Sequence, residues 1–174
     1  LSTRPGENFA WPVFEGIDVH SGYVNASPFN QDAFNPLYPA SGCSQFFRFR
    51  DLIKQHSSAP ANQPPFLNPC NSSQQIPLSI PQFLHTPPVI DWRHGSSSAR
   101  TWIFSSGLAT PINIGAAGSP VSGSMFAGNC SIGGVWYTAT DFPAQFRDKY
   151  FAADYGSGWI KACTFVSNNK PVAV

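Results

Sequence analysis

Near its C-terminal end the sequence reads YFAADYGSGWIKACTF (residues 150–165), and this segment contains its clearest structural signal. Its two halves, 150–154 and 159–165, are rich in the aromatic and β-branched residues that favour strands. Between them, Tyr155-Gly156-Ser157-Gly158 is a run of turn formers with two glycines. This pattern predicts a β-hairpin.

Shorter strands are predicted on both sides of this hairpin. Residues 133–138 form an expected buried strand entered through a double glycine, and residues 141–143 form a turn. A turn at residues 168–170 precedes a last strand that begins at Pro171. Successive short strands with tight turns are typical of one blade of a β-propeller.

The composition agrees with a β-rich, loop-rich chain. The 174 residues (18.9 kDa) make one ordinary domain or a piece of a larger protein. Only 11% of the residues are charged, against about 25% in a typical domain, and Lys and Glu are scarce. A helical bundle is therefore disfavoured.

The net charge of +1 excludes a strongly basic surface for nucleic acid or for a membrane. No apolar run reaches the ~18 residues of a membrane span. The first residues, 1–5, do not have the form of a signal peptide and are interpreted as a mature or cut end.

Three segments differ in character. Residues 1–24 are aromatic and turn-rich, and residues 89–174 contain the predicted strands. Residues 25–88 are interpreted as an insertion rich in Pro, Ser and Asn. Within the insertion, residues 45–56 are the one stretch predicted to form a short helix.

The four cysteines are interpreted as two disulfides. They have neither CxxC spacing nor a histidine at zinc-finger spacing, so no metal site is predicted. Of the three possible pairings we favour Cys43–Cys70 and Cys130–Cys163, because each pair brackets a region of distinct character. Four buried free thiols are the alternative.

Three sequons predict N-glycosylation at Asn25, Asn71 and Asn129. Together with the cysteines they favour a secreted, extracellular glycoprotein. The alternative is an unglycosylated protein exported by a bacterium.

Two side chains are candidates for binding a sugar. Trp11 could stack on the apolar face of a pyranose, although a tryptophan fixed by a neighbouring proline is more often a packing residue. His94 could act as a ligand-binding group, or it could be an ordinary loop histidine beside Gly and Ser. No other histidine has an Asp or Ser at the spacing of a catalytic triad, and no catalytic residue is predicted.

Two segments resemble the soluble quinoprotein sugar dehydrogenases, the glucose/sorbosone dehydrogenase family. Residues 6–16, GENFAWPVFEG, resemble the family pattern G-x-N-Y-G-W-P-x-x-x-G. Residues 132–165 resemble its late-blade pattern of a double-glycine strand, an aromatic pair, Phe-Pro, Y-F-x-x-D-Y and Gly-Trp-Ile. The matched segments cover about a third of the chain.

The resemblance implies an all-β, partial β-propeller fold. The family has six four-stranded antiparallel blades, and this chain corresponds to about one and a half of them, with residues 25–88 as a long, disulfide-pinned insertion. The remaining blades would lie on the same chain or on a neighbouring one.

Two functions remain open at this point. The first is a structural or carbohydrate-binding role without redox chemistry. The alternative is a part of an enzyme that oxidises an aldose with pyrroloquinoline quinone and calcium. The resemblance implies that most cofactor ligands lie on earlier blades, so no cofactor is expected for this chain alone.

Overall fold

The computed structural model describes residues 8–95, 97–167 and 170–174. Parts of three expectations therefore lie outside the described residues: the N-terminal end 1–5, the start of the 6–16 motif, and the turn at 168–169. The chain is all-β, with 42% of its residues in strands and 9% in helices. None of the described helices is long and apolar enough to span a membrane.

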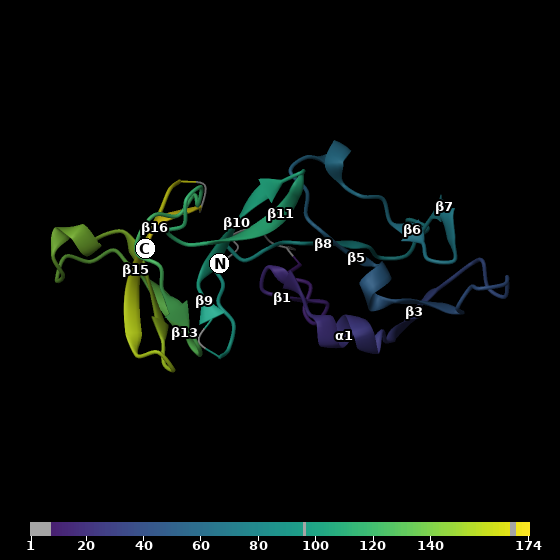
Figure 1. Cartoon of the computed structure of the whole chain (residues 1–174), viewed down its shortest axis with the longest axis horizontal. Coiled ribbons are helices and arrows are strands. Elements are labelled where there is room, and N and C mark those ends of the chain that lie inside the picture. The colour runs from purple at the N-terminus through teal and green to yellow at the C-terminus, as the bar shows by residue number, and fades with distance from the viewer. Residues whose placement is uncertain (1–7, 96, 168–169) are drawn as a thin grey trace. The chain divides into compact units, whose positions relative to one another are not determined.

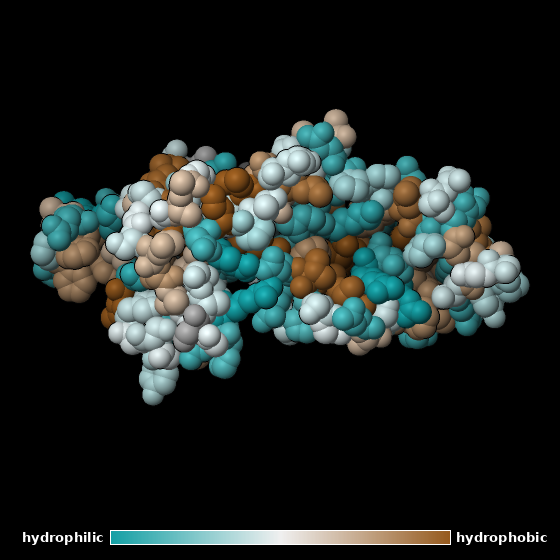
Figure 2. Space-filling view, viewed as in Figure 1, coloured by the Kyte–Doolittle hydropathy of each residue, from teal (hydrophilic) through white to brown (hydrophobic). Residues whose placement is uncertain are grey.

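The chain divides into two compact units, which are described separately. The C-terminal unit comprises residues 88–103 and 110–174, and the N-terminal unit comprises residues 8–87 and 104–109. Large apolar side chains are exposed in both units. Brown areas of apolar residues are accordingly visible on the face drawn in Figure 2.

A four-stranded antiparallel sheet dominates the C-terminal unit. Its strands follow one another in chain order, coloured green to yellow in Figure 1. They are β13 (Ser131–Tyr137), β14 (Lys149–Asp154), β15 (Trp159–Phe165) and β16 (Pro171–Ala173). Asp154 pairs with Trp159 and Tyr150 with Cys163, which confirms the predicted hairpin.

Strand β13 forms where a strand is predicted, but the prediction that it is buried is wrong. Residues 131–136 are exposed, since β13 is an edge strand of the sheet and, within the described residues, pairs with β14 alone. Its register shifts between Ile132 and Val135, where the double glycine lies. At Gly134 a β-carbon would stand 2.1 Å from the carbonyl oxygen of Phe151, so the close approach of the two backbones requires glycine there.

Shorter elements complete the C-terminal unit. Strands β10 and β11 form a hairpin whose tip, residues 104–109, is grouped with the N-terminal unit, and β9 pairs with β12. Residues 89–92 begin the segment in which strands are predicted; within the described residues they form an isolated bridge between Asp91 and Arg100 rather than a longer strand. The core contains Ala99, Ile114 and Val121. The bounds are β9 (Ser97–Ser98), β10 (Arg100–Ser105), β11 (Leu108–Asn113), β12 (Ala127–Gly128) and η3 (Ala144–Phe146).

The N-terminal unit is built from small two-stranded sheets. Strands β1 and β2, β3 and β4, and β6 and β7 pair antiparallel, whereas β5 and β8 pair in parallel. Its elements are β1 (Phe14–Glu15), β2 (Asp18–Val19), α1 (Ser21–Ala26), β3 (Phe29–Phe34), β4 (Phe46–Arg48), η1 (Phe49–Asp51), β5 (Ile53–Gln55), η2 (Pro60–Asn62), β6 (Leu67–Asn68), β7 (Asn71–Gln75) and β8 (Phe83–His85).

The helix predicted over residues 45–56 is wrong. That stretch forms β4, a short 3₁₀ turn and β5. Phe46 pairs across to Phe34, and Phe47 lies in the core at 1% exposure beside Ala33. Alternating aromatic side chains find partners on opposite faces of a strand, and this packing outweighs the approximate helical spacing.

One of the two predicted disulfides is present. Cys43 and Cys70 are bonded, with their Cα atoms 5.1 Å apart, so the loop before β4 is joined to the loop before β7. The bond closes a loop within residues 25–87, which belong to one unit with residues 8–24.

The predicted Cys130–Cys163 disulfide is wrong, because both cysteines are free. The register of the sheet explains why. The Cys130 carbonyl accepts a hydrogen bond from Tyr155, whereas Cys163 pairs with Tyr150, five positions away along β14. At roughly 3.3 Å per residue this offset is about 16 Å, and a disulfide needs Cα atoms within about 7 Å.

Candidate functional site

A cavity of about 320 Å³ lies against one face of the four-stranded sheet in the C-terminal unit. We call it the aromatic pocket. This volume is at the lower end of the range, ~300–1,000 Å³, that is typical of small-molecule sites. Its lining residues are Val89, Ile90, Asp91, Trp92, Phe126, Ser131, Ile132, Tyr150, Ala152, Trp159, Lys161, Cys163 and Phe165.

The period of a β-strand brings the polar and aromatic lining residues together. Trp159, Lys161, Cys163 and Phe165 alternate along β15, so their side chains share one face. On the neighbouring strand, Tyr150 lies opposite Cys163 and contributes to the same face. The floor of the pocket therefore follows directly from the hairpin that the sequence predicts.

Three aromatic rings form the wall at one end. Trp92, Phe126 and Trp159 meet edge to face, with ring centroids 5.2 Å apart for both pairs that include Trp159 and 6.3 Å apart for the third pair. The Trp92 indole donates to Asp154 Oδ2 at 2.8 Å, and the Trp159 indole donates to the Ala127 carbonyl at 2.8 Å. Since both N–H groups are already used, these rings can offer a ligand only their carbon surface.

The Asp154 carboxylate fixes the position of Trp92 in this aromatic wall. Asp154 is 2% exposed and ends strand β14. Besides the Trp92 indole, it accepts hydrogen bonds from the backbone N–H groups of Asn129 (2.9 Å) and Ser157 (2.7 Å). Burial acts to raise the pKa of Asp154, but these hydrogen bonds outweigh it and hold the pKa below its ordinary value. The carboxylate is therefore ionised, and its oxygens are turned to the protein.

Lys161 brings a positive charge to the same pocket. Its Nζ lies 4.4 Å from the ring centroid of Phe126 and 5.6 Å from that of Trp159, which is cation–π geometry. Burial raises the pKa of the Cys163 thiol to about 11, and the charge of Lys161 acts in the opposite direction. The positive charge of Lys161 therefore acts on Cys163, which lies on the pocket floor.

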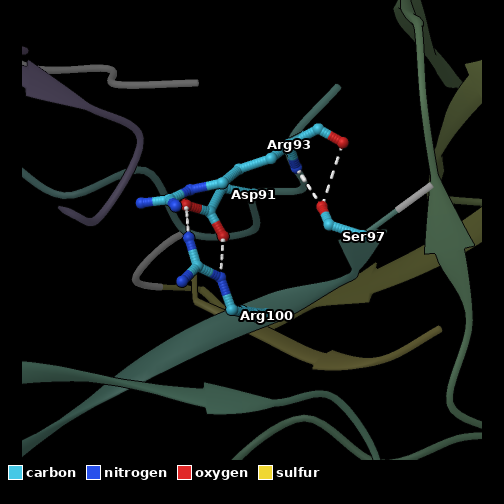
Figure 3. A network of polar contacts seen from close by, with 4 residues as sticks. All are labelled: Asp91, Arg93, Ser97 and Arg100. Carbon is cyan, nitrogen blue, oxygen red and sulfur yellow. Dashed lines mark hydrogen bonds and ion pairs between the residues drawn. The ribbon is translucent and has the colours of Figure 1, made fainter. Parts of the chain in front are cut away.

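An ion pair closes the side of the pocket formed by residues 89–92. Arg100 donates from Nε and Nη2 to the two oxygens of Asp91, at 3.0 and 2.8 Å. Figure 3 shows the carboxylate facing the guanidinium across the bridge between their backbones. Next to it, Ser97 Oγ donates to the Arg93 carbonyl at 2.9 Å and fixes the loop that carries His94.

Neither candidate residue from the sequence lines this pocket. Trp11 belongs to the N-terminal unit, where it is 69% exposed and meets His20 edge to face at 5.8 Å. Trp11 therefore packs against His20 at the surface of the unit. His94 is an exposed loop residue of the C-terminal unit.

Sequence reasoning did not select Trp92, Trp159 or Lys161 as site residues. The alternation of Trp159 and Lys161 within a predicted strand was the available signal, because period two places both on one face. The contribution of Trp92 depends on a contact 62 residues away, with Asp154, and nothing local in the sequence indicates it.

The three sequon asparagines lie in different surroundings. Asn25 is exposed on α1. Asn71 accepts a hydrogen bond from the Ser73 N–H at 3.1 Å. Asn129 accepts one from the Gly95 N–H at 2.6 Å, and a β-carbon at Gly156 would stand 2.7 Å from its Nδ2. Asn25 is therefore the most open of the three.

Across the part of the chain that is described, no three His, Cys, Asp or Glu side chains are grouped so as to hold a metal ion. No family model, curated protein or solved structure matches the chain. The resemblance to the quinoprotein family accordingly stays a prediction.

Proposed function

We propose that this chain is an extracellular carbohydrate-binding protein and that the aromatic pocket is its sugar site. The observation that carries the proposal is the wall of Trp92, Phe126 and Trp159 around a cavity of about 320 Å³. A pyranose has an apolar C–H face that packs on a flat aromatic ring, and two fixed indoles present such surfaces without an N–H that competes for the ligand's hydroxyls.

The polar lining supports the same class of ligand. Asp91, Ser131, Tyr150 and Lys161 stand among the apolar lining residues. A few polar groups on a mainly aromatic surface are what a ligand with hydroxyls around an apolar ring requires. The cavity is large enough for a small ligand or for the terminal unit of a longer one.

The proposal includes a propeller-type scaffold. The antiparallel order β13-β14-β15-β16 is the connectivity of one four-stranded propeller blade. The remaining blades would be supplied by the same polypeptide or by a neighbouring chain. The Cys43–Cys70 disulfide supports an oxidising, extracellular location, and the exposed Asn25 supports glycosylation there.

Mutation of the aromatic wall tests the sugar site. The protein is screened against immobilised neutral and acidic oligosaccharides, and the affinity for each hit is measured by titration calorimetry. We expect Trp159→Ala to weaken binding at least tenfold, and Trp159→Phe, which keeps a flat ring, to weaken it less. Trp11→Ala is the matched control, because it removes an exposed indole from the other unit and should leave the affinity unchanged.

Two results would contradict the proposal. One is that Trp159→Ala binds the saccharide with the same affinity as the unmodified protein, when circular dichroism shows that both are folded. The other is a visible absorption band of a bound quinone in the purified protein, which would favour the sugar dehydrogenase alternative.

A further inference from the structure

We propose that the aromatic pocket selects anionic saccharides and that Lys161 pairs with the carboxylate of the sugar. This inference rests on the proposed function and names the class of sugar.

The charge of Lys161 has no acidic counterpart. Within the described ranges, no Asp or Glu oxygen lies at ion-pair distance from Lys161, whose contacts are the rings of Phe126 and Trp159. Lys161 is half-buried and lines the pocket, with its Nζ over two aromatic rings. A positive charge in such a setting attracts an anion more strongly than one in bulk water.

The two acidic groups next to the pocket already have partners in the protein. Asp91 forms a bidentate ion pair with Arg100. Asp154 is buried and accepts hydrogen bonds from Trp92, Asn129 and Ser157. Asp91 is therefore paired with a cation of its own, and the Asp154 oxygens point at their donors in the protein, so neither carboxylate forms an ion pair with Lys161.

The placement of the cation suits a sugar acid in particular. Lys161 Nζ lies over the Phe126 ring at 4.4 Å and over the Trp159 ring at 5.6 Å, so the cation is next to the aromatic surface on which a sugar would stack. A uronic acid carries its carboxylate on the rim of the ring and keeps an apolar C–H face. It can stack on an indole and reach the ammonium at the same time, whereas a neutral sugar makes only the first contact.

Paired ligands test this selectivity. Galacturonate and glucuronate oligosaccharides are each titrated against their methyl esters, which keep the sugar skeleton but lose the charge. We expect the acids to bind at least tenfold more tightly than the esters at low salt, and the preference to shrink as salt is added. Lys161→Gln should abolish the preference, so that acids and esters bind with equal affinity, and Lys161→Arg should retain it.

Lys54→Gln is the matched control, because Lys54 also lies over a ring, that of Phe66 at 5.4 Å, but in the other unit. It should keep the full preference for the acids. Equal binding of acids and esters, or a preference that survives Lys161→Gln, would overturn the inference and leave the carbohydrate-binding function standing. Failure of acids, esters and neutral sugars alike to bind would overturn both.

Discussion

At the scale of single residues, Asp154 links the turn of the hairpin to the aromatic wall. One oxygen accepts from the Ser157 N–H inside the turn, and the other accepts from Trp92 and from the Asn129 N–H. Three chain segments thus share one buried negative charge. The close fit extends to Gly128, where a β-carbon would stand 2.2 Å from the Trp92 ring. The orientation of Trp92 is therefore determined by its neighbours before any ligand arrives.

His85 gives the N-terminal unit a pH dependence. Its ring is fully buried, stacks on Phe14 at 4.0 Å and contacts Gln55 Oε1 through Nδ1 at 3.0 Å. Burial lowers the pKa of His85 to about 4. Between pH 6.5 and pH 4 the unfolded chain therefore binds a proton that the folded unit does not bind, and the free energy of unfolding falls as the pH falls.

We expect Tm to be nearly constant above about pH 7 and to drop as the pH falls towards 4. Thermal melts followed by circular dichroism across this range measure the slope. His85→Gln should flatten the slope, whereas His94→Gln, at an exposed position, should leave it unchanged. A slope that persists in His85→Gln would contradict this account.

At the scale of elements, the sequence predicts the C-terminal hairpin well and the segment around Phe47 poorly. The hairpin is encoded locally, since a turn with two glycines separates two strand-forming runs. The strand that holds Phe46 is encoded by distant partners, Phe34 across the sheet and Ile76 in the core. Propensity and spacing within residues 45–56 contain no information about those partners.

The double glycine of β13 offers a matched pair of variants. At Gly134 a β-carbon would meet the Phe151 carbonyl at 2.1 Å and the Tyr150 ring at 2.6 Å, whereas at Gly133 nothing lies within 4 Å. We expect Gly134→Ala to cost about 1–3 kcal/mol of stability and Gly133→Ala much less. Urea unfolding followed by tryptophan fluorescence measures both. Equal stabilities for the two variants would show that the strands are not this close.

Substitution of the cysteines tests which of them form a disulfide. Removing the Cys43–Cys70 bond by the double change to serine should cost about 2–4 kcal/mol, because the unfolded chain gains freedom over a separation of 27 residues. The control is Cys130→Ser, at an exposed free thiol, and it should change little.

Thiol alkylation followed by peptide mass spectrometry measures how readily each free cysteine reacts. In the native protein Cys130 should react first, and Cys163 only on unfolding, since burial raises the pKa of Cys163 to about 11. Recovery of a Cys130–Cys163 disulfide from native material would contradict the register of the sheet.

At the scale of the whole molecule, the site is harder to predict than the fold. The all-β class follows from the scarcity of Lys and Glu and from the turn-forming residues. The candidate residues Trp11 and His94 were chosen from local context, yet the pocket is assembled from segments 89–92, 126–132 and 150–165. Only folding brings those segments together, so one sequence alone does not reveal the pocket.

The exposed edge of the sheet has a consequence for assembly. In the part of the chain that the structure describes, strand β13 pairs on one side only. It carries no charged residue, and its Val135 is 63% exposed. At the other edge, β16 is contacted by Ser122. An uncharged, unpaired edge favours pairing with a further strand. We therefore expect the 174-residue chain to self-associate in sedimentation velocity experiments as its concentration rises.

Val135→Lys should suppress this association by charging the edge. Ile160→Lys is the control, because it adds the same charge at a 73% exposed position on the inner strand β15. A chain that stays monomeric at every concentration, or equal suppression by both variants, would contradict association through the edge.

The most direct test of the sugar site is a titration followed through the indole N–H signals of the five tryptophans by NMR. The spectrum is recorded while galacturonate oligosaccharides are added. We predict that the signals of Trp92 and Trp159 shift together and saturate with a single affinity, whereas the signal of Trp11 stays in place. If saccharide binding shifted Trp11 and left Trp92 and Trp159 unmoved, the aromatic pocket would not be the site.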